Sequence, residues 1–254
     1  MRVAKIVAIA NQKGGVGKTT TAVNLSSCVS ALGKKVLIVD LDPQGNTTSG
    51  IGGSAGAHSV YEALMGRTPL SACLQSTCVK GLSLIPADIR LAGAELELVE
   101  LDRREYRLKH LLKTIEGDFD FLFVDCPPSL GLLTVNALTA AQRVLIPIQC
   151  EYYALEGVSS LMNTVNRVKH AFNPGLDIEG VLLTMLDART NLGIQVVDSV
   201  KKHFKSRVFA TAIPRNVRLG EAPSHGLPIH LYDPRSLGAD SYRRLAQEFL
   251  QRNR

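Results

Sequence analysis

The stretch Lys-Gly-Gly-Val-Gly-Lys-Thr-Thr, residues 13–20, limits the possible folds of this chain more than any other. It follows the apolar run of residues 6–10, which predicts a buried strand, and it precedes residues 19–32, which have a helical pattern. Glycines allow backbone N–H groups to approach an anion closely, and the N-terminus of the helix adds partial positive charge. A strand, a glycine-rich loop and a helix in this order therefore predict a phosphate-binding loop.

We expect every residue of this loop to contact a bound nucleotide. Lys18 is expected to reach the β- and γ-phosphates, and the Thr19 hydroxyl to ligate Mg²⁺, a hard cation that prefers oxygen ligands. The alternative is a glycine turn with an incidental lysine, which the agreement of eight consecutive positions disfavours. The predicted nucleotide-binding residues of the loop are Lys13, Gly14, Gly15, Val16, Gly17, Lys18, Thr19 and Thr20.

The loop departs from the common pattern G-x-x-x-x-G-K-[ST], because Gln12 stands where that pattern has glycine and a second lysine, Lys13, precedes the glycines. This form is the deviant Walker A signature, and residues 11–21 resemble those of the ParA/Soj chromosome partition ATPases in the ParA/MinD group. The resemblance extends over nearly the whole chain. It implies that Lys13 reaches across a dimer interface to the partner's nucleotide, so that both Lys13 and Lys18 take part in catalysis.

The 254 residues suffice for one large α/β domain, and 45% apolar with 20% charged residues is typical of a globular protein. Strand and helix patterns alternate along the chain, which predicts a doubly wound, mainly parallel sheet with helices on both faces. We expect one P-loop domain spanning residues 1–254, without an N-terminal helix-turn-helix extension. The five cysteines are odd in number and lack metal-site spacing, which is typical of reduced cytosolic thiols.

Four further segments complete the predicted elements. The Gly/Ser/Thr-rich residues 47–57 predict a mobile loop, and the leucine spacing of residues 90–115 predicts a helical region. The apolar residues 208–213 predict the last strand. A final helix is expected over residues 236–252, with an apolar face that packs on the core.

Acidic residues end two of the predicted buried strands. Asp40 and Asp42 follow one apolar run, and Asp125 ends another. The carboxyl ends of parallel strands are where α/β sheets bind ligands. By resemblance to the family's switch regions, Asp42 positions the attacking water, whereas Asp40 and Asp125 lie at the Mg²⁺ ion. The alternative for each residue is an ordinary acidic strand end.

Three residues are assigned to the nucleotide by resemblance alone. Glu151 follows another predicted strand, in a segment that the family places at the dimer interface near the partner's nucleotide. Pro214 and Asn216 lie in the loop that the family uses to line adenine. The N-K-x-D motif of guanine-specific GTPases is absent from the sequence, which favours ATP over GTP. We do not expect Cys126 to act as a nucleophile, because no histidine stands near it in the sequence.

The net charge of +6 is concentrated in the last quarter of the chain. Residues 1–186 hold 17 basic and 17 acidic residues, whereas residues 187–254 hold 12 basic and 6 acidic ones. This excess favours a face that binds a polyanion, with a solvated helix surface as the alternative. Arg189 and Arg218 match positions that the resemblance associates with sequence-independent DNA binding, through phosphate contacts that weaken as salt rises.

The resemblance implies a complete cycle. ATP and Mg²⁺ bind, two protomers form a homodimer, and the dimer binds non-specific DNA. A ParB-type partition protein then stimulates an otherwise weak ATPase, and the dimer leaves DNA. We therefore expect a cytoplasmic, nucleoid-associated protein of chromosome or plasmid segregation. No apolar run reaches the roughly 18 residues that span a bilayer, and the C-terminal residues lack bulky lipid-seeking side chains, so no membrane contact is expected.

Three alternatives stay open on the sequence. A MinD-like membrane-positioning ATPase would need a basic amphipathic C-terminal anchor, which residues 250–254 do not resemble. A reductase like the nitrogenase iron protein would need cysteines in cluster-bridging motifs, which this sequence lacks. An ATPase of the same group that positions another cargo is barely distinguished by sequence. The cargo, and a chromosomal as opposed to a plasmid role, are likewise not specified by the sequence.

Overall fold

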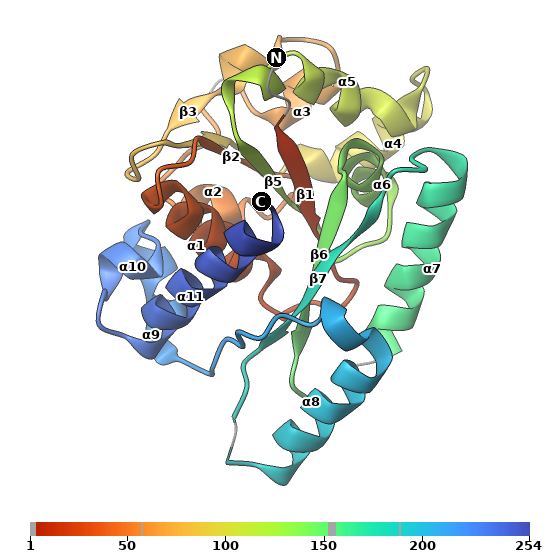
Figure 1. The fold of residues 1–254 in the computed structure, drawn as a ribbon. Helices are drawn as coiled ribbons and strands as arrows, with labels where there is room; N and C mark the ends of the chain where they lie inside the picture. The colour runs from red at the N-terminus through yellow and green to blue at the C-terminus, as the bar shows by residue number, and fades with distance from the viewer. Residues whose placement is uncertain (1–3, 57, 152–155, 188) are drawn as a thin grey trace.

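The computed structural model describes residues 4–56, 58–151, 156–187 and 189–254, with a seven-stranded sheet at its centre (Figure 1). The strands are β1 (Lys5–Ile9), β2 (Val36–Asp40), β3 (Gln75–Ser76), β4 (Leu82–Ile85), β5 (Phe121–Asp125), β6 (Arg143–Gln149) and β7 (Asp177–Thr184). They lie in the order β3-β4-β2-β5-β1-β6-β7, and every neighbouring pair is parallel except β3–β4. The predicted doubly wound, mainly parallel sheet is confirmed.

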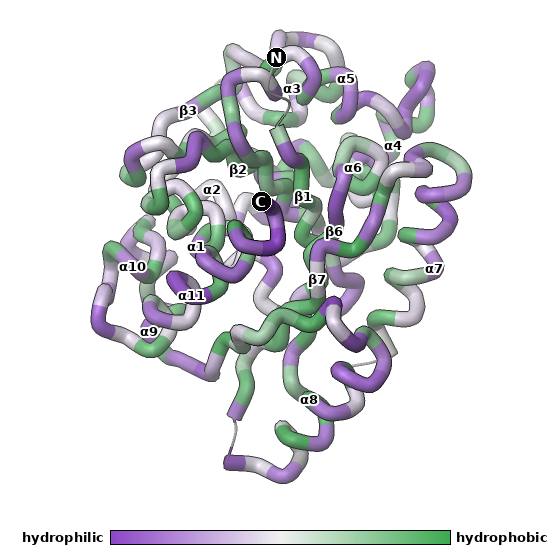
Figure 2. The backbone as a smooth tube through the Cα atoms, viewed as in Figure 1, coloured by the Kyte–Doolittle hydropathy of each residue, from purple (hydrophilic) through white to green (hydrophobic). Residues whose placement is uncertain are grey.

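The central strands form because their sequences are apolar almost without interruption. All five residues of β2 and all five of β5 are buried, including the aspartate that ends each strand. A strand buried on both faces needs a helical layer on each side. Figure 2 shows hydrophobic residues gathered along these central strands.

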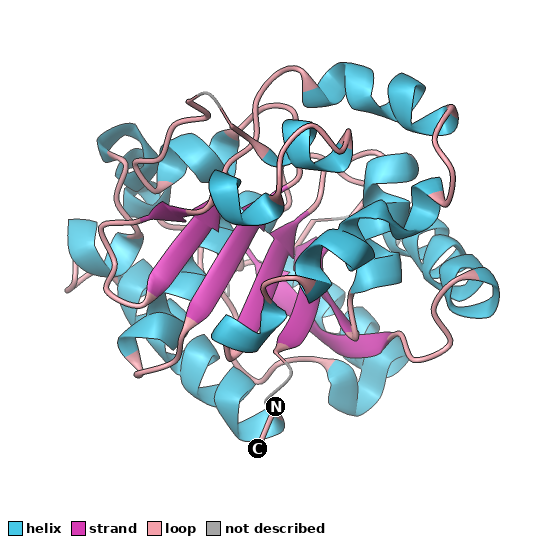
Figure 3. Cartoon of the chain, turned by 90° about the horizontal axis from the view of Figure 1, so that it is seen from above, coloured by secondary structure: helices cyan, strands magenta, loops and turns pink. Residues whose placement is uncertain are grey.

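Helices cover both faces of the sheet (Figure 3). One face packs against α1 (Lys18–Ala31), α2 (Asn46–Gly50), α9 (Val217–Glu221), α10 (Ile229–Tyr232) and α11 (Leu237–Arg252). The other packs against α3 (Val60–Leu64), α4 (Leu91–Val99), α5 (Arg107–Lys113), α6 (Leu132–Ala140), α7 (Glu156–Ala171) and α8 (Asn191–Phe204). Two hydrophobic clusters fill the spaces between the layers. In the described part of the chain, no helix is long and apolar enough to cross a membrane.

The strand register brings the ends of three strands to one level. Asp125 of β5 pairs with Ile9 of β1 on one side and with Asp40 of β2 on the other. The residues that follow these ends therefore share the carboxyl edge of the sheet, where α/β proteins bind ligands. Residues 13–20 and both aspartates meet at this edge although they are far apart in the sequence.

Two segments differ from expectation. The first four residues of the loop expected over residues 47–57 belong instead to the short helix α2, Asn46–Gly50. The helical region expected over residues 90–115 is divided into α4 and α5, because the chain turns at Arg103, whose φ of 50° lies in the left-handed region. A left-handed residue cannot continue an α-helix.

The strand expected over residues 208–213 is wrong. This segment is extended, but it meets the sheet through isolated bridges, Val181 with Val208 and Leu186 with Pro214. Phe209 packs directly over Gly180, where an added Cβ would lie 2.5 Å from the ring. The apolar side chains of this segment therefore pack against β7, and the segment does not form a continuous strand there.

The packing of α11 on the sheet yields a stability prediction. The Phe249 ring is buried, 5.2 Å from that of Phe121 and 5.4 Å from that of Phe123. Phe249→Ala should lower the free energy of unfolding by about 3–5 kcal/mol, because these contacts are lost and a cavity remains. Urea denaturation measures the change. As a control on the same helix, Leu237→Ala alters a side chain that is 69% exposed and should cost less than about 0.5 kcal/mol. Similar losses in both variants would contradict the described packing.

Candidate nucleotide-binding site

The phosphate loop joins β1 to α1, and its backbone requires glycine. Gly15 and Gly17 have φ values of 73° and 87°, in the left-handed region that favours glycine. A Cβ added at Gly14 or Gly15 would meet no protein atom within 4 Å, so the space beside them is open to a ligand. Helix α1 begins directly after Gly17, and its first-turn N–H groups lie next to this space. The loop geometry therefore suits a phosphate group.

Two buried side chains outside the glycine run hold the loop in shape. Asn11 donates from Nδ2 to the Pro147 carbonyl at 2.7 Å and accepts from the Lys13 N–H at 3.1 Å. Thr184, the last residue of β7, donates its hydroxyl to the Val16 carbonyl at 2.8 Å. These bonds attach the loop to β6 and β7. Because the loop is already ordered, binding a phosphate group costs less conformational entropy.

The two lysines of the loop lie in different environments. Lys18 is buried, and its Nζ donates to the Lys13 carbonyl at 3.2 Å. Burial lowers the pKa of Lys18, and the charge of Asp125 opposes that shift. The Lys13 side chain is 36% exposed, and its Nζ lies 3.6 Å from Oε2 of Glu151. Glu151 also lies 3.8 Å from Arg215. Within one protomer, Glu151 is therefore an ion-pair partner of Lys13.

Asp125 is fully buried at the centre of the site. Its Oδ2 accepts from the Thr19 hydroxyl at 2.8 Å and from the Thr47 hydroxyl at 2.7 Å. Its Oδ1 is buried and has no hydrogen-bond partner among the described residues. A buried carboxylate oxygen without a donor is costly unless a cation satisfies it. Hydroxyl and carboxylate oxygens are ligands that Mg²⁺ prefers, so Thr19 and Asp125 fit this ion.

Both carboxylate oxygens of Asp40 accept hydrogen bonds from the chain itself. Its Oδ2 accepts from the N–H and the hydroxyl of Thr48, at 2.8 and 2.7 Å, and its Oδ1 accepts from the Asp42 N–H at 3.1 Å. Asp42 is 8% exposed, and its Oδ1 accepts from the Gln44 N–H at 3.0 Å. The structure thus brings all three predicted aspartates together beside the phosphate loop.

Burial changes the proton affinity of these acids. It raises the pKa of Asp125 to about 7 and the pKa of Asp40 to about 6, because desolvation penalises the charged form. The Asp40 charge raises the pKa of Asp125 further, whereas the hydrogen bonds from Thr47 and Thr19 lower it. Burial also raises the pKa of Cys126 far above its ordinary value, which agrees with the expectation that this thiol is not a nucleophile.

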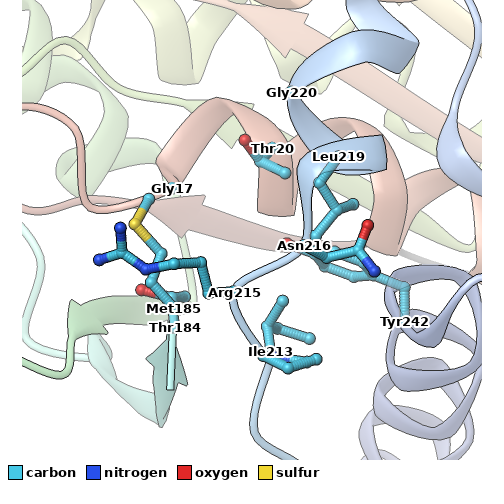
Figure 4. Close-up of a pocket in the computed structure, with 11 residues that line it drawn as sticks. Gly17, Thr20, Thr184, Met185, Ile213, Arg215, Asn216, Leu219, Gly220 and Tyr242 are labelled. Carbon is cyan, nitrogen blue, oxygen red and sulfur yellow. The ribbon is translucent and has the colours of Figure 1, made fainter. Parts of the chain in front are cut away.

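A cavity of about 220 Å³ opens beside the phosphate loop (Figure 4). Gly17 and Thr20 form one side, and Pro214 and Asn216 lie on the side formed by the segment before α9. The Oδ1 atom of Asn216 is buried without a hydrogen-bond partner in the described structure. The location suits a base adjacent to the phosphates, and the contact of Pro214 and Asn216 with adenine stays a prediction.

Sequence reasoning missed four polar residues that build the site. Thr47 and Thr48 bond to the buried acids, and Asn11 and Thr184 bond to the phosphate loop. For three of them the sequence signal was position, since the two threonines follow the turn after Asp42 and Asn11 lies two residues before the start of the loop at Lys13. Nothing in a single sequence indicates that a strand-end threonine such as Thr184 contacts a distant loop.

The predicted DNA-binding residues are exposed and ion-paired. The Arg189 side chain is 89% exposed and pairs with Asp187 at 2.8 Å, and Arg218 pairs with Glu221 at the same distance. Both arginines lie a few residues beyond the last bridge at the end of β7, on the carboxyl edge that also carries the phosphate loop. Exposed ion pairs of this kind contribute little to folding stability. Both guanidinium groups can therefore leave their present partners for other anions at a small free-energy cost.

A doubly wound sheet with a glycine-rich loop between its first strand and helix, and acidic strand ends beside it, defines a P-loop nucleotide-binding protein. A family model described as an AAA domain matches residues 4–178. The chain belongs to the ParA/Soj family of chromosome-partitioning proteins.

Three similar proteins support this assignment. The sporulation initiation inhibitor protein Soj of Bacillus subtilis is 59% identical over 246 residues, covering 96% of this chain and 97% of that protein. The chromosome partitioning protein ParA of Myxococcus xanthus is 50% identical over 253 residues, covering 99% and 89%. A solved structure named cobyrinic acid a,c-diamide synthase, from Mycobacterium smegmatis with bound ATP analogue and magnesium, is 41% identical with a TM-score of 0.86. That match covers 98% of this chain and 95% of the other.

The buried, partly unpaired Asp125 predicts a stability effect that depends on pH. The folded protein without ligand holds a proton on Asp125 up to about pH 7, whereas an unfolded aspartate loses it near pH 4, so stability falls as pH rises between these values. Asp125→Asn removes this titration. Without nucleotide or Mg²⁺, the free energy of unfolding of the variant should exceed that of the wild-type protein by about 1–2 kcal/mol at pH 8. At pH 4.5 the two proteins should have almost the same stability.

Thermal unfolding at the two pH values measures this difference. Asp198→Asn, at an exposed position of α8, is the control and should leave the stability unchanged at both pH values. Adding Mg²⁺ and ATP should stabilise the wild-type protein much more than Asp125→Asn. A variant that is destabilised equally at both pH values would show that Asp125 is an ordinary structural acid.

Proposed function

We propose that this protein is an ATP-dependent, dimerising ATPase that binds DNA without sequence preference in its ATP state and acts in chromosome or plasmid segregation. The observation that carries the proposal is the buried Asp125, whose Oδ2 accepts from Thr19 at the end of the phosphate loop and whose Oδ1 is unpaired among the described residues. The relatives named Soj and ParA support a role in chromosome partitioning. The bound ATP analogue and magnesium of the Mycobacterium structure support ATP and Mg²⁺ as cofactors.

In the proposed reaction, water attacks the γ-phosphorus of ATP and ADP leaves. The loop N–H groups and Lys18 hold the phosphates and offset their charge, since phosphoryl transfer depends mainly on positioning and charge stabilisation. Thr19 and Asp125 would hold Mg²⁺, with Asp40 close by, and the ion would offset negative charge on the phosphate oxygens. Asp42, buried two residues after the end of β2, orients the attacking water.

The exposed Lys13 suits a role between protomers. Within one protomer its ammonium group pairs with Glu151, whose side chain is 44% exposed. An exposed ion pair contributes at most about 1 kcal/mol, so Lys13 can leave Glu151 for the phosphates of a partner protomer. We infer that Glu151 then lies at the same interface, near the partner's nucleotide.

DNA binding is assigned to Arg189 and Arg218 on the carboxyl edge. Both guanidinium groups are exposed enough to contact phosphates, which gives affinity without base readout. ATP-driven dimerisation would double the number of such contacts. A ParB-type partition protein is proposed to stimulate hydrolysis, after which the dimer dissociates and leaves the nucleoid.

DNA binding to a fragment of arbitrary sequence tests the proposal. We would measure it with ATP, with ADP and without nucleotide, at two salt concentrations. Binding only with ATP, weakened at the higher salt concentration, is expected. Absence of binding in every state would refute the DNA-bound cycle, and ATP-dependent sedimentation with liposomes would then identify a MinD-like ATPase.

Asp42→Ala separates nucleotide binding from hydrolysis. The variant should bind ATP as the wild-type protein does, because the Asp42 carboxylate accepts from the Gln44 N–H and makes no hydrogen bond to the phosphate loop among the described residues. Its hydrolysis rate should fall about 100-fold or more, leaving the dimer trapped on DNA. Equilibrium binding of a fluorescent ATP analogue and phosphate release measure the two effects, with Asp198→Ala as the control. Loss of nucleotide binding in Asp42→Ala would contradict the assigned role.

Charge reversal at the two arginines separates DNA binding from dimerisation. Arg189→Glu combined with Arg218→Glu should reduce DNA affinity more than about tenfold and flatten its salt dependence. ATP-dependent dimerisation, measured by light scattering, should persist. The control Lys113→Glu with Arg167→Glu makes the same change in net charge at exposed positions of α5 and α7 and should retain DNA binding. Normal DNA binding by the first variant would place the DNA surface elsewhere.

A further inference from the structure

Arg215 lies where the two segments that carry the proposed DNA-binding arginines separate. Its N–H donates to the Leu186 carbonyl at 3.3 Å, and Leu186 pairs with Pro214 in an isolated bridge. From this junction, one segment reaches Arg189 three residues after Leu186, and the other reaches Arg218 three residues after Arg215. Arg215 is therefore fixed by its backbone at the base of both segments.

The Arg215 side chain is largely in solvent and close to the first of these segments. Arg215 lines the cavity beside the phosphate loop, but its side chain is 68% exposed, and Figure 4 shows it extending away from Asn216. The pKa of Asp187 is lowered to about 2, mainly by hydrogen bonds from Arg189 and in part by the charge of Arg215. The Arg215 guanidinium thus lies within electrostatic reach of the ion pair between Asp187 and Arg189.

Glu151 offsets the charge of Arg215 in the single protomer. One carboxylate oxygen of Glu151 lies 3.8 Å from Nη2 of Arg215, and the other lies 3.6 Å from Nζ of Lys13. The side-chain amide of Gln149 also donates to the oxygen that faces Arg215. The carboxylate is thus shared between the phosphate loop and an arginine near the DNA-binding residues. A negative charge at this place repels DNA phosphates and weakens any contact that Arg215 could make with them.

Dimerisation would take this acid away from Arg215. The proposed dimer moves Lys13 to the partner's phosphates and places Glu151 at the interface, near the partner's nucleotide. A carboxylate drawn into that interface leaves Arg215, and the loss of one exposed ion pair costs little free energy. The step that completes the nucleotide site would therefore also free a positive charge near Arg189 and Arg218.

We propose that Arg215 is a third contact to DNA phosphates, which Glu151 masks in the nucleotide-free protomer and releases in the ATP-bound dimer. The inference rests on the proposed function, because it requires an ATP-dependent dimer that binds DNA. It gives a physical cause for the ATP dependence, since each protomer of the dimer gains a contact that a separate protomer lacks. A contact to phosphate provides affinity without base readout.

DNA binding in the ATP state tests the contact. Arg215→Gln should lower the affinity for a fragment of arbitrary sequence about fivefold or more. The slope of log affinity against log salt concentration should become shallower by about one for each protomer, because one phosphate contact is lost. Arg215→Lys keeps the charge and should bind DNA within twofold of the wild-type protein, whereas a role that needs the guanidinium geometry would not be rescued by lysine.

Two measurements control this experiment. Lys113→Gln removes the same charge at an exposed position of α5 and should leave the DNA affinity and the salt slope unchanged. ATP-dependent dimerisation of Arg215→Gln, measured by light scattering, should persist. Loss of dimerisation would assign Arg215 to the interface between protomers and overturn the proposed DNA contact.

DNA binding without nucleotide tests the masking and avoids any effect on dimerisation. Glu151→Gln keeps the shape of the side chain and removes its charge. At a salt concentration low enough to detect weak binding, this variant should bind DNA about threefold to fivefold more tightly than the wild-type protein. The gain should persist when Lys13→Gln is added and disappear when Arg215→Gln is added. Asp198→Asn, which removes an exposed acid of α8, should give no gain.

The outcomes separate the inference from the proposed function. If the wild-type protein binds DNA with ATP and Arg215→Gln does so with the same affinity and salt dependence, the inference alone is wrong. If Glu151→Gln gives the same gain with and without Arg215, the acid acts by general repulsion and the masking is refuted. If the wild-type protein binds DNA in no nucleotide state, the proposed function is wrong and the inference falls with it.

Discussion

The burial of Asp125 in the centre of the sheet is the constraint on which the site depends. The carboxylate ends a strand that has helices over both faces, so water cannot solvate it, and its donors must come from the chain. Thr19 of α1 and Thr47 of α2 supply them, which fixes the orientation of both helices relative to β5. One oxygen stays unpaired, so the protein alone leaves an electrostatic cost that a bound cation removes. Ligand binding and folding stability are therefore linked through one side chain.

The fold and the main site residues were predictable because they follow from local patterns. Continuous apolar runs identified the buried strands, and the aspartates that end them were visible without any tertiary information. The phosphate loop was equally clear, since glycine spacing and backbone geometry are directly related. The expectation that Pro214 and Asn216 lie near the nucleotide came from family resemblance, and the cavity beside Gly17 is consistent with it.

The rest could not be predicted because it depends on contacts between distant residues. Helix α2 consists of asparagine, threonine, serine and glycine, residues that favour a loop, and it forms where Thr47 and Thr48 bond to buried acids. Residues 208–213 have the composition of a strand, yet this segment pairs with the β7 side of the sheet only at isolated bridges. Local propensity decided neither case, since tertiary hydrogen bonds and packing outweigh it.

The extended segment of residues 208–214 has a consequence for solubility. The Phe209 N–H donates to the Val181 carbonyl at 2.9 Å, and the Ile213 N–H donates to the Leu183 carbonyl at 2.8 Å. These bonds occupy part of the outer edge of β7, which would otherwise present unpaired groups to a strand of another molecule. The segment thus protects the sheet against edge-to-edge aggregation without adding a full strand to it.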